Sequence, residues 1–159
     1  MSNITTRTGD TGSTDIKGYR VKKNSSIMNL IGDLDEAQAH IIYAYTLDNE
    51  RGGSFPNIVE NLVKISAIIA GYKEVSEFPT EEINLIEEAI EERGALTFDW
   101  VYPFNNSFMA QCNVARTVVR RAERSAYGEL NEAEFNTIKI YLNRLSDLLF
   151  TYTSDNKWR

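Results

Sequence analysis

Apolar residues recur at steps of three and four along most of the chain, and this spacing is typical of one face of an α-helix. The first such stretch follows Ser25 or Ser26, either of which could cap a helix. A second stretch follows the segment 52–56, where glycines and a proline predict a turn. The apolar positions of the two stretches are Ile27, Leu30, Ile31, Leu34, Ala37, Ile41, Ala44 and Tyr45, then Ile58, Leu62, Ile65, Ile68 and Ile69.

Three more helices are predicted further along. Thr80 is placed to open the third, which buries Ile83, Ile86 and Ile90 and ends at Gly94. The fourth begins near 105–107 and runs to Gly128. The fifth begins at Asn131, where Glu134 would complete a capping arrangement, and continues to about Thr153.

No strand pattern of useful length, internal repeat or linker is found, and residues 1–24 form a polar head. Helices of roughly 20 residues joined by short turns favour an antiparallel bundle. We therefore predict an all-α fold, a five-helix bundle with the up-down packing of ferritin-like proteins. Residues 1–159 form its single domain.

Composition narrows the class of protein. The 159 residues are 42% hydrophobic and 25% charged, close to globular averages. We find neither a membrane span nor a signal peptide and expect a cytoplasmic protein that does not bind membranes. The single Cys112 and single His40 exclude an internal disulfide and a zinc cluster of the usual kind. A net charge of -6 disfavours nucleic acid as a partner.

Positive charge is nevertheless concentrated on the fourth helix, where 116–124 holds four arginines and one glutamate. Helical spacing places Arg116, Arg120, Glu123 and Arg124 on one face. The planar guanidinium group of arginine can donate paired hydrogen bonds to phosphate oxygens. This face therefore either binds an anion or is a solvated or salt-bridged surface.

Polar residues also interrupt the apolar stripes of two other helices. The fifth helix has Asn143, Arg144 and Asp147 among leucines, and the first has Asp33, Asp35 and Glu36. Buried polar groups need partners, so these residues either bridge helices or contact a ligand. One of the first helix's carboxylates could meet the arginine face.

Two further segments leave alternatives open. The head contains TRTGDTGST, which is too polar to fill a core and is either idle or shaped for a ligand. The connector 95–107 holds Trp100, Tyr102, Pro103 and Phe104, which could simply cover the core.

Taken in order, TRTGDTGST, Lys23, GDLDEAQ, ARTVVRRAERS and YLNRLSDLLF resemble the signature blocks of the PduO-type ATP:cob(I)alamin adenosyltransferases. The resemblance spans 6–150. It implies a homotrimer with sites between subunits. It also implies transfer of the 5′-deoxyadenosyl group of ATP to cob(I)alamin, with magnesium accompanying the nucleotide.

The resemblance also assigns roles to residues. Arg116 and Arg120 would bind phosphates and stabilise the leaving triphosphate, with Asp35 pairing Arg116. Glu123 and Asn143 would orient the nucleotide or its magnesium ion. The residues of the head that would bind ATP are Thr6, Arg7, Thr8, Gly9, Asp10, Gly12, Thr14 and Lys23.

Trp100 would lie beneath the corrinoid ring, where the family has a phenylalanine. The substituted connector and a tail that stops at Arg159 leave a second reading, a non-catalytic ATP- or corrinoid-binding carrier or sensor. A purely structural bundle is a third. If the protein is an enzyme, a reductase and a cobalamin-dependent client enzyme are possible partners.

Overall fold

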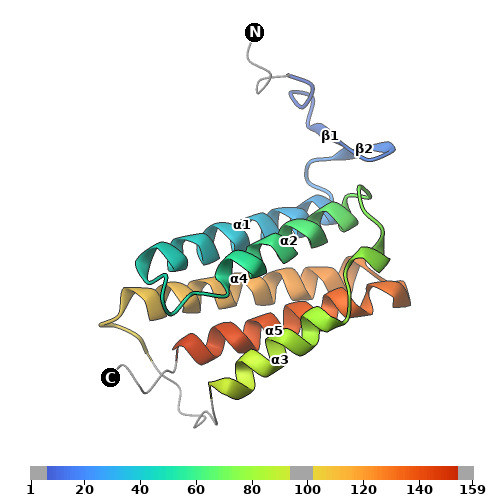
Figure 1. Cartoon of the computed structure of the whole chain (residues 1–159). Helices are drawn as coiled ribbons and strands as arrows, with labels where there is room; N and C mark the ends of the chain where they lie inside the picture. Colours follow the sequence, from blue (N-terminus) through green and yellow to red (C-terminus); the bar gives the residue numbers. More distant parts are fainter. Residues whose placement is uncertain (1–6, 94–101, 154–159) are drawn as a thin grey trace.

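The structure is a computed structural model that describes residues 7–93 and 102–153, and five α-helices make up most of it (Figure 1). The helices are α1 Ser26–Leu47, α2 Phe55–Ile69, α3 Glu81–Glu92, α4 Ser107–Glu129 and α5 Asn136–Thr153. Successive helices run in opposite directions, α1 packs on α2 and α4, and α5 packs on α4 and α3. The prediction of an all-α five-helix bundle is confirmed.

The core follows from the spacing of the apolar residues. On α1 the buried residues are Leu30, Leu34, Ala37, Ile41 and Ala44, which repeat every three or four positions and face the neighbouring helices. Each large aliphatic side chain removed from water stabilises the fold by about 1.5–3 kcal/mol before entropy is subtracted. The apolar stripes read from the sequence are therefore the surfaces that join the helices.

The helix ends agree with the sequence in most places. Ser25 is the N-cap of α1 and Thr80 that of α3, although neither side chain makes a capping hydrogen bond. Asn106 caps α4, and its Oδ1 accepts from the backbone N–H of Met109 at 2.9 Å.

The predicted start of α5 at Asn131 is wrong. Residues Ala133–Phe135 form a short 3₁₀ turn, η2, and the α-helix begins at Asn136. A capping pattern placed before a 3₁₀ turn is easily mistaken for the start of the longer helix.

The absence of strands was also predicted wrongly, because the head contains a hairpin. Strand β1 Ser13–Ile16 pairs antiparallel with β2 Tyr19–Lys22, and Gly18 in the turn has a φ of 91°. Glycine adopts this conformation without steric cost. Strands of four residues, with Ile16 as their one buried side chain, are too short to show an alternation of apolar residues, so the sequence gives little signal for them.

The hairpin projects beyond one end of the bundle, next to the start of α1 and the end of α2 (Figure 1). The backbone N–H of Lys17 donates to the carbonyl of Ala70, just past α2, at 3.2 Å. The head is thus anchored on the α1 and α2 side of the molecule. Within the ranges described, no helix has the length and apolar character needed to cross a membrane.

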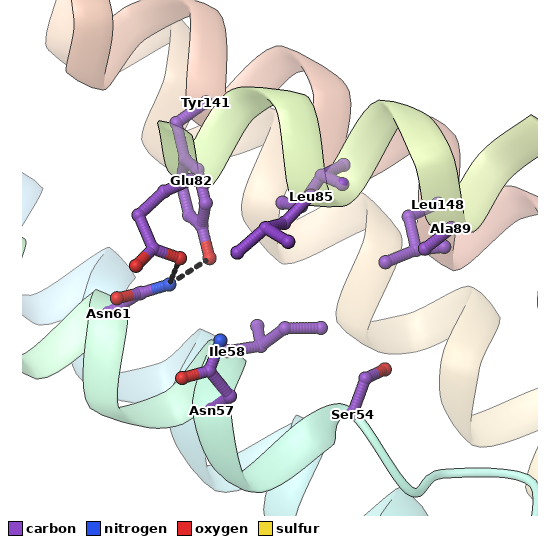
Figure 2. Close-up of a pocket in the computed structure, with 10 residues that line it drawn as sticks. Ser54, Asn57, Ile58, Asn61, Glu82, Leu85, Ala89, Tyr141 and Leu148 are labelled. Carbon is purple, nitrogen blue, oxygen red and sulfur yellow. Dashed lines mark hydrogen bonds between the residues drawn. The ribbon is translucent and has the colours of Figure 1, made fainter. Parts of the chain in front are cut away.

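A polar link holds α3 to α2 and α5 at one edge of a small pocket (Figure 2). Asn61, on α2, is 3% exposed and donates from Nδ2 to Glu82 Oε2 at 2.7 Å and to the hydroxyl of Tyr141 at 3.2 Å. Burial raises the pKa of Tyr141 and keeps its hydroxyl neutral. Since Glu82 lies on α3 and Tyr141 on α5, the buried amide fixes three helices together.

Candidate functional site

Arg116 and Arg120 lie one turn apart on α4, along its border with α5. Arg116 donates from Nε to Asn113 Oδ1 at 3.0 Å, and its guanidinium carbon lies 5.9 Å from the ring centroid of Phe150 on α5. Partial burial lowers the pKa of Arg116, and the like charge of Arg120 lowers it further. Two like-charged guanidinium groups one helical turn apart favour an added anion between them.

Glu123 and Asn143 meet beside this arginine pair. Asn143, on α5, donates from Nδ2 to Glu123 Oε1 at 2.9 Å. Arg144 donates from Nη1 to Asn143 Oδ1 at 2.7 Å and from Nε to Glu87 Oε1, on α3, at 2.6 Å. Two residues that the sequence assigned to one site are thus in direct contact.

Asp147 lies one helical turn after Asn143 and adds a carboxylate to the same surface. Partial desolvation raises its pKa, Arg144 and Arg120 oppose that shift, and Glu123 adds to it. These couplings place Arg120, Glu123 and Asp147 within electrostatic reach of one another. The polar residues that interrupt the apolar stripe of α5 therefore gather beside the arginines of α4.

The carboxylates of α1 are arranged differently from the expected pairing. Asp33 accepts from Arg121 Nε at 2.8 Å and from Ser125 Oγ at 2.9 Å, and Glu36 also accepts from Arg121. A carboxylate of α1 does meet an arginine of α4, but that arginine is Arg121. It lies on the α1 side of α4, away from the border with α5.

Asp35 is exposed and lines a shallow hollow between α1 and α2, together with Gln38, Val63 and Ser66. This places its side chain beside α2, whereas Arg116 lies on α4 next to α5. Its predicted pairing with Arg116 is therefore not a contact that the fold makes within one chain. The reason is geometric, because residues 33 and 35 of a helix face directions about 200° apart.

The head brings Gly9, Gly12 and Lys23 together. The backbone N–H of Lys23 donates to the carbonyl of Gly12 at 3.0 Å. A Cβ at Gly9 would lie 2.7 Å from Lys23 Nζ, so the ammonium group rests directly on the glycine backbone. Gly12 has a φ of 77°, which favours glycine. A cation held against an exposed glycine turn is suited to phosphate oxygens.

The other residues predicted for the head surround this turn. The backbone N–H of Asp10 donates to the carbonyl of Arg7, whose φ is 57°, and Thr14 pairs with Val21 in the hairpin. Thr6 lies outside the described residues, as does Trp100, the residue predicted to contact the corrinoid.

Arg20 is a residue of the head that the sequence analysis missed. It donates to both carboxylate oxygens of Asp15, at 3.1 and 3.2 Å, and from Nη2 to the carbonyl of Thr8 at 2.6 Å. Asp15 and Arg20 are opposite each other in the hairpin register. Only a prediction of the hairpin could have revealed this pair, which ties the loop to the strands.

The two halves of the candidate site are separated within one chain. The head lies beyond the bundle, next to the start of α1 and the end of α2 (Figure 1), and the arginine pair lies on α4 where it borders α5. Over 7–93 and 102–153, no cluster of three or more histidine, cysteine, aspartate or glutamate side chains could hold a metal ion.

Comparison with known proteins identifies the fold and the family. The family model described as cobalamin adenosyltransferase matches residues 4–154. A cobalamin adenosyltransferase of Cupriavidus metallidurans is 34% identical, with 94% of this chain and 85% of the relative aligned. A corrinoid adenosyltransferase of Mycobacterium leprae is 33% identical over 94% of this chain and 88% of its own length.

Solved structures have the same fold. A variant PduO-type ATP:co(I)rrinoid adenosyltransferase from Lactobacillus reuteri, complexed with ATP, superposes with a TM-score of 0.85 at 24% identity, covering 98% of this chain and 94% of the other. A second variant of the Lactobacillus reuteri enzyme, complexed with cobalamin and ATP, gives 0.84 at 25% identity, covering 98% and 91%. From the matching family model and these relatives, we conclude that the chain belongs to the cobalamin adenosyltransferase family.

Proposed function

We propose that this protein carries out the reaction of its family at a site that two chains complete. The reaction transfers the 5′-deoxyadenosyl group of ATP to cob(I)alamin and forms adenosylcobalamin and triphosphate. The observation that supports a shared site is the separation, within one chain, of a head suited to phosphate from an arginine pair suited to the same phosphates.

The chemistry requires an anion to leave. The cobalt(I) ion gives an electron pair to C5′ of ATP, a cobalt–carbon bond forms, and the C5′–O5′ bond breaks with its electrons on the triphosphate. Arg116 and Arg120 would bind that triphosphate and stabilise the charge that grows on it. The partial burial of Arg116 strengthens this effect, because electrostatic interactions increase where water is excluded.

The head would hold the other side of the phosphate chain. Lys23 supplies positive charge against Gly9, and the glycine turn at Gly12 allows a ligand to approach the backbone closely. The ribose and base would then lie near Glu123 and Asn143. A magnesium ion carried by ATP would take its protein contact from Glu123. Trp100 stays a prediction for the corrinoid side.

The surfaces of a single chain suit a head-to-tail contact between copies. The side of α1 and α2 carries the exposed Ile42 and Val63, and it also holds Asp35 in its hollow. Docking that side onto α4 and α5 of the next chain would bring Asp35 to Arg116 and the head to the arginine pair. A heterologous contact of this kind gives a ring when its rotation closes, and the family resemblance favours a ring of three copies.

The test is an adenosylation assay with protein, ATP, magnesium and chemically reduced cobalamin, followed by the absorbance change that accompanies a cobalt–carbon bond. We expect conversion by the parent and a loss of about 100-fold or more for Arg120→Ala, the cost of removing one donor to a developing oxyanion. ATP binding without conversion would instead support the carrier or sensor reading. An Arg120→Ala variant that binds and reacts like the parent would support a purely structural bundle.

A further inference from the structure

Arg144 lies between α3 and the proposed ATP site. We propose that Glu87 and Arg144 are positioning residues that fix the amide of Asn143, so that the orientation of α3 controls the nucleotide side of the site. This inference rests on the proposed function, because it assigns Asn143 and Glu123 to the ATP site.

The amide of Asn143 is held at both ends. Its two ends are chemically different, and its Nδ2 donates to Glu123 while its Oδ1 accepts from Arg144. A flipped amide would point an N–H group at the guanidinium and an oxygen at the carboxylate, and both hydrogen bonds would be lost. Arg144 therefore sets which end of the amide faces Glu123.

Arg144 is itself held by a carboxylate of α3. Its Nη1 donates to Asn143 Oδ1, and its Nε donates to Glu87 Oε1, on α3, at 2.6 Å. The hydrogen bond to Glu87 raises the pKa of Arg144, which shows that the contact favours the charged guanidinium. The guanidinium group is planar and rigid, so a hydrogen bond at one of its nitrogens restricts the directions of the others. Glu87 thus orients the group that orients Asn143.

A second contact of α3 distinguishes positioning by Glu87 from simple docking of α3 on the bundle. A second polar link, from Glu82 of α3 to Asn61 of α2, lies five residues before Glu87 (Figure 2). This link also fastens α3 to the bundle, and its partners, Asn61 and Tyr141, are buried. It has no hydrogen bond to Asn143 or Glu123. Weakening it should cost at least as much stability and should not disturb the amide.

The test compares Glu87→Ala with Glu82→Ala in the full chain. The dissociation constant for ATP, measured by calorimetry with magnesium, should rise about five- to tenfold for Glu87→Ala, the effect of loosening one charge-assisted hydrogen bond. It should stay within twofold of the parent for Glu82→Ala, even though that variant loses at least as much thermal stability. Glu87→Gln keeps an acceptor oxygen for Arg144 and should restore most of the affinity.

A double-mutant cycle adds a readout that docking alone would not change. If Glu87 acts through Asn143, then Glu87→Ala should have no further effect on ATP affinity in an Asn143→Ala background. Equal losses of affinity in both α3 variants, or effects of Glu87→Ala and Asn143→Ala that simply multiply, would overturn the positioning role. A parent that does not bind ATP would overturn the proposed function and this inference together.

Discussion

Replacing Gly9 by alanine should weaken ATP binding without destabilising the fold. The new Cβ would lie 2.7 Å from Lys23 Nζ and 3.0 Å from Lys23 Cε. Carbon atoms in contact usually keep about 3.5–4.0 Å, so the ammonium group must move by about 1 Å. This group is the end of a flexible side chain, so it can move at little cost in the free energy of unfolding.

The loss of affinity can be estimated from that displacement. At an effective dielectric constant of about 20, moving a unit charge from about 4 to 5 Å from a phosphate charge costs about 1 kcal/mol. The dissociation constant for ATP should therefore rise about fivefold, since about 1.4 kcal/mol corresponds to a factor of ten. The melting temperature should stay level or rise slightly, because alanine reduces the entropy of the unfolded chain.

Calorimetry with ATP and magnesium, beside a thermal melt, measures both effects. Gly128→Ala is the matched control, since a Cβ there meets nothing within 4 Å, and it should leave ATP affinity unchanged. In a Lys23→Ala background the effect of Gly9→Ala should vanish. A Gly9→Ala variant that binds ATP like the parent, or that weakens binding equally without Lys23, would refute the reasoning.

Three further predictions concern carboxylates and the thiol. Asp33→Ala should lower the free energy of unfolding by about 1–3 kcal/mol, because Arg121 Nε and Ser125 Oγ lose their shared acceptor, yet it should leave the KM for ATP unchanged. Asp35→Ala should raise the KM for ATP and leave the free energy of unfolding unchanged; denaturant titration and kinetics measure both quantities, and equal effects of the two variants would contradict the prediction. Asp147→Asn should raise stability at neutral pH, since the raised pKa of Asp147 means that its charged form is disfavoured in the fold. That gain should shrink as the pH falls toward the raised pKa and vanish below about pH 4, where the carboxyl of the parent is protonated in both states, and a gain that grows on acidification would contradict the sign. Burial raises the pKa of Cys112 to about 12, so iodoacetamide should label it only as fast as the protein unfolds, and rapid native labelling at pH 8 would count against this.

The helices were predictable because their apolar residues carry a strong periodic signal. Leu30, Leu34, Ile41 and their counterparts on the other helices are buried as that spacing requires. Asn106 acts as the α4 cap within the stretch predicted for its start. The hairpin was missed because two four-residue strands with one buried side chain depend on a turn glycine and cross-strand pairs instead of a continuous buried face.

The candidate site could be predicted only in part. Helical spacing placed Arg116, Arg120 and Glu123 together, and the block around Asn143 supplied the partner of Glu123. Spacing within one helix cannot show which neighbouring helix a side chain will meet. Asp33 and Glu36 therefore took Arg121 as their partner, and the contact of Glu87 with Arg144 gave no signal in the sequence.

Mixing two defective chains tests most directly whether one site is built from two copies. Lys23→Ala damages the head and Arg120→Ala damages the arginine pair, so each variant alone should be nearly inactive in the adenosylation assay. When the two are co-expressed in equal amounts, about a quarter of the interfaces between copies should combine an intact head with an intact arginine pair. We predict recovery of about a quarter of the parental activity, and activity no greater than that of the separate variants would contradict a shared site.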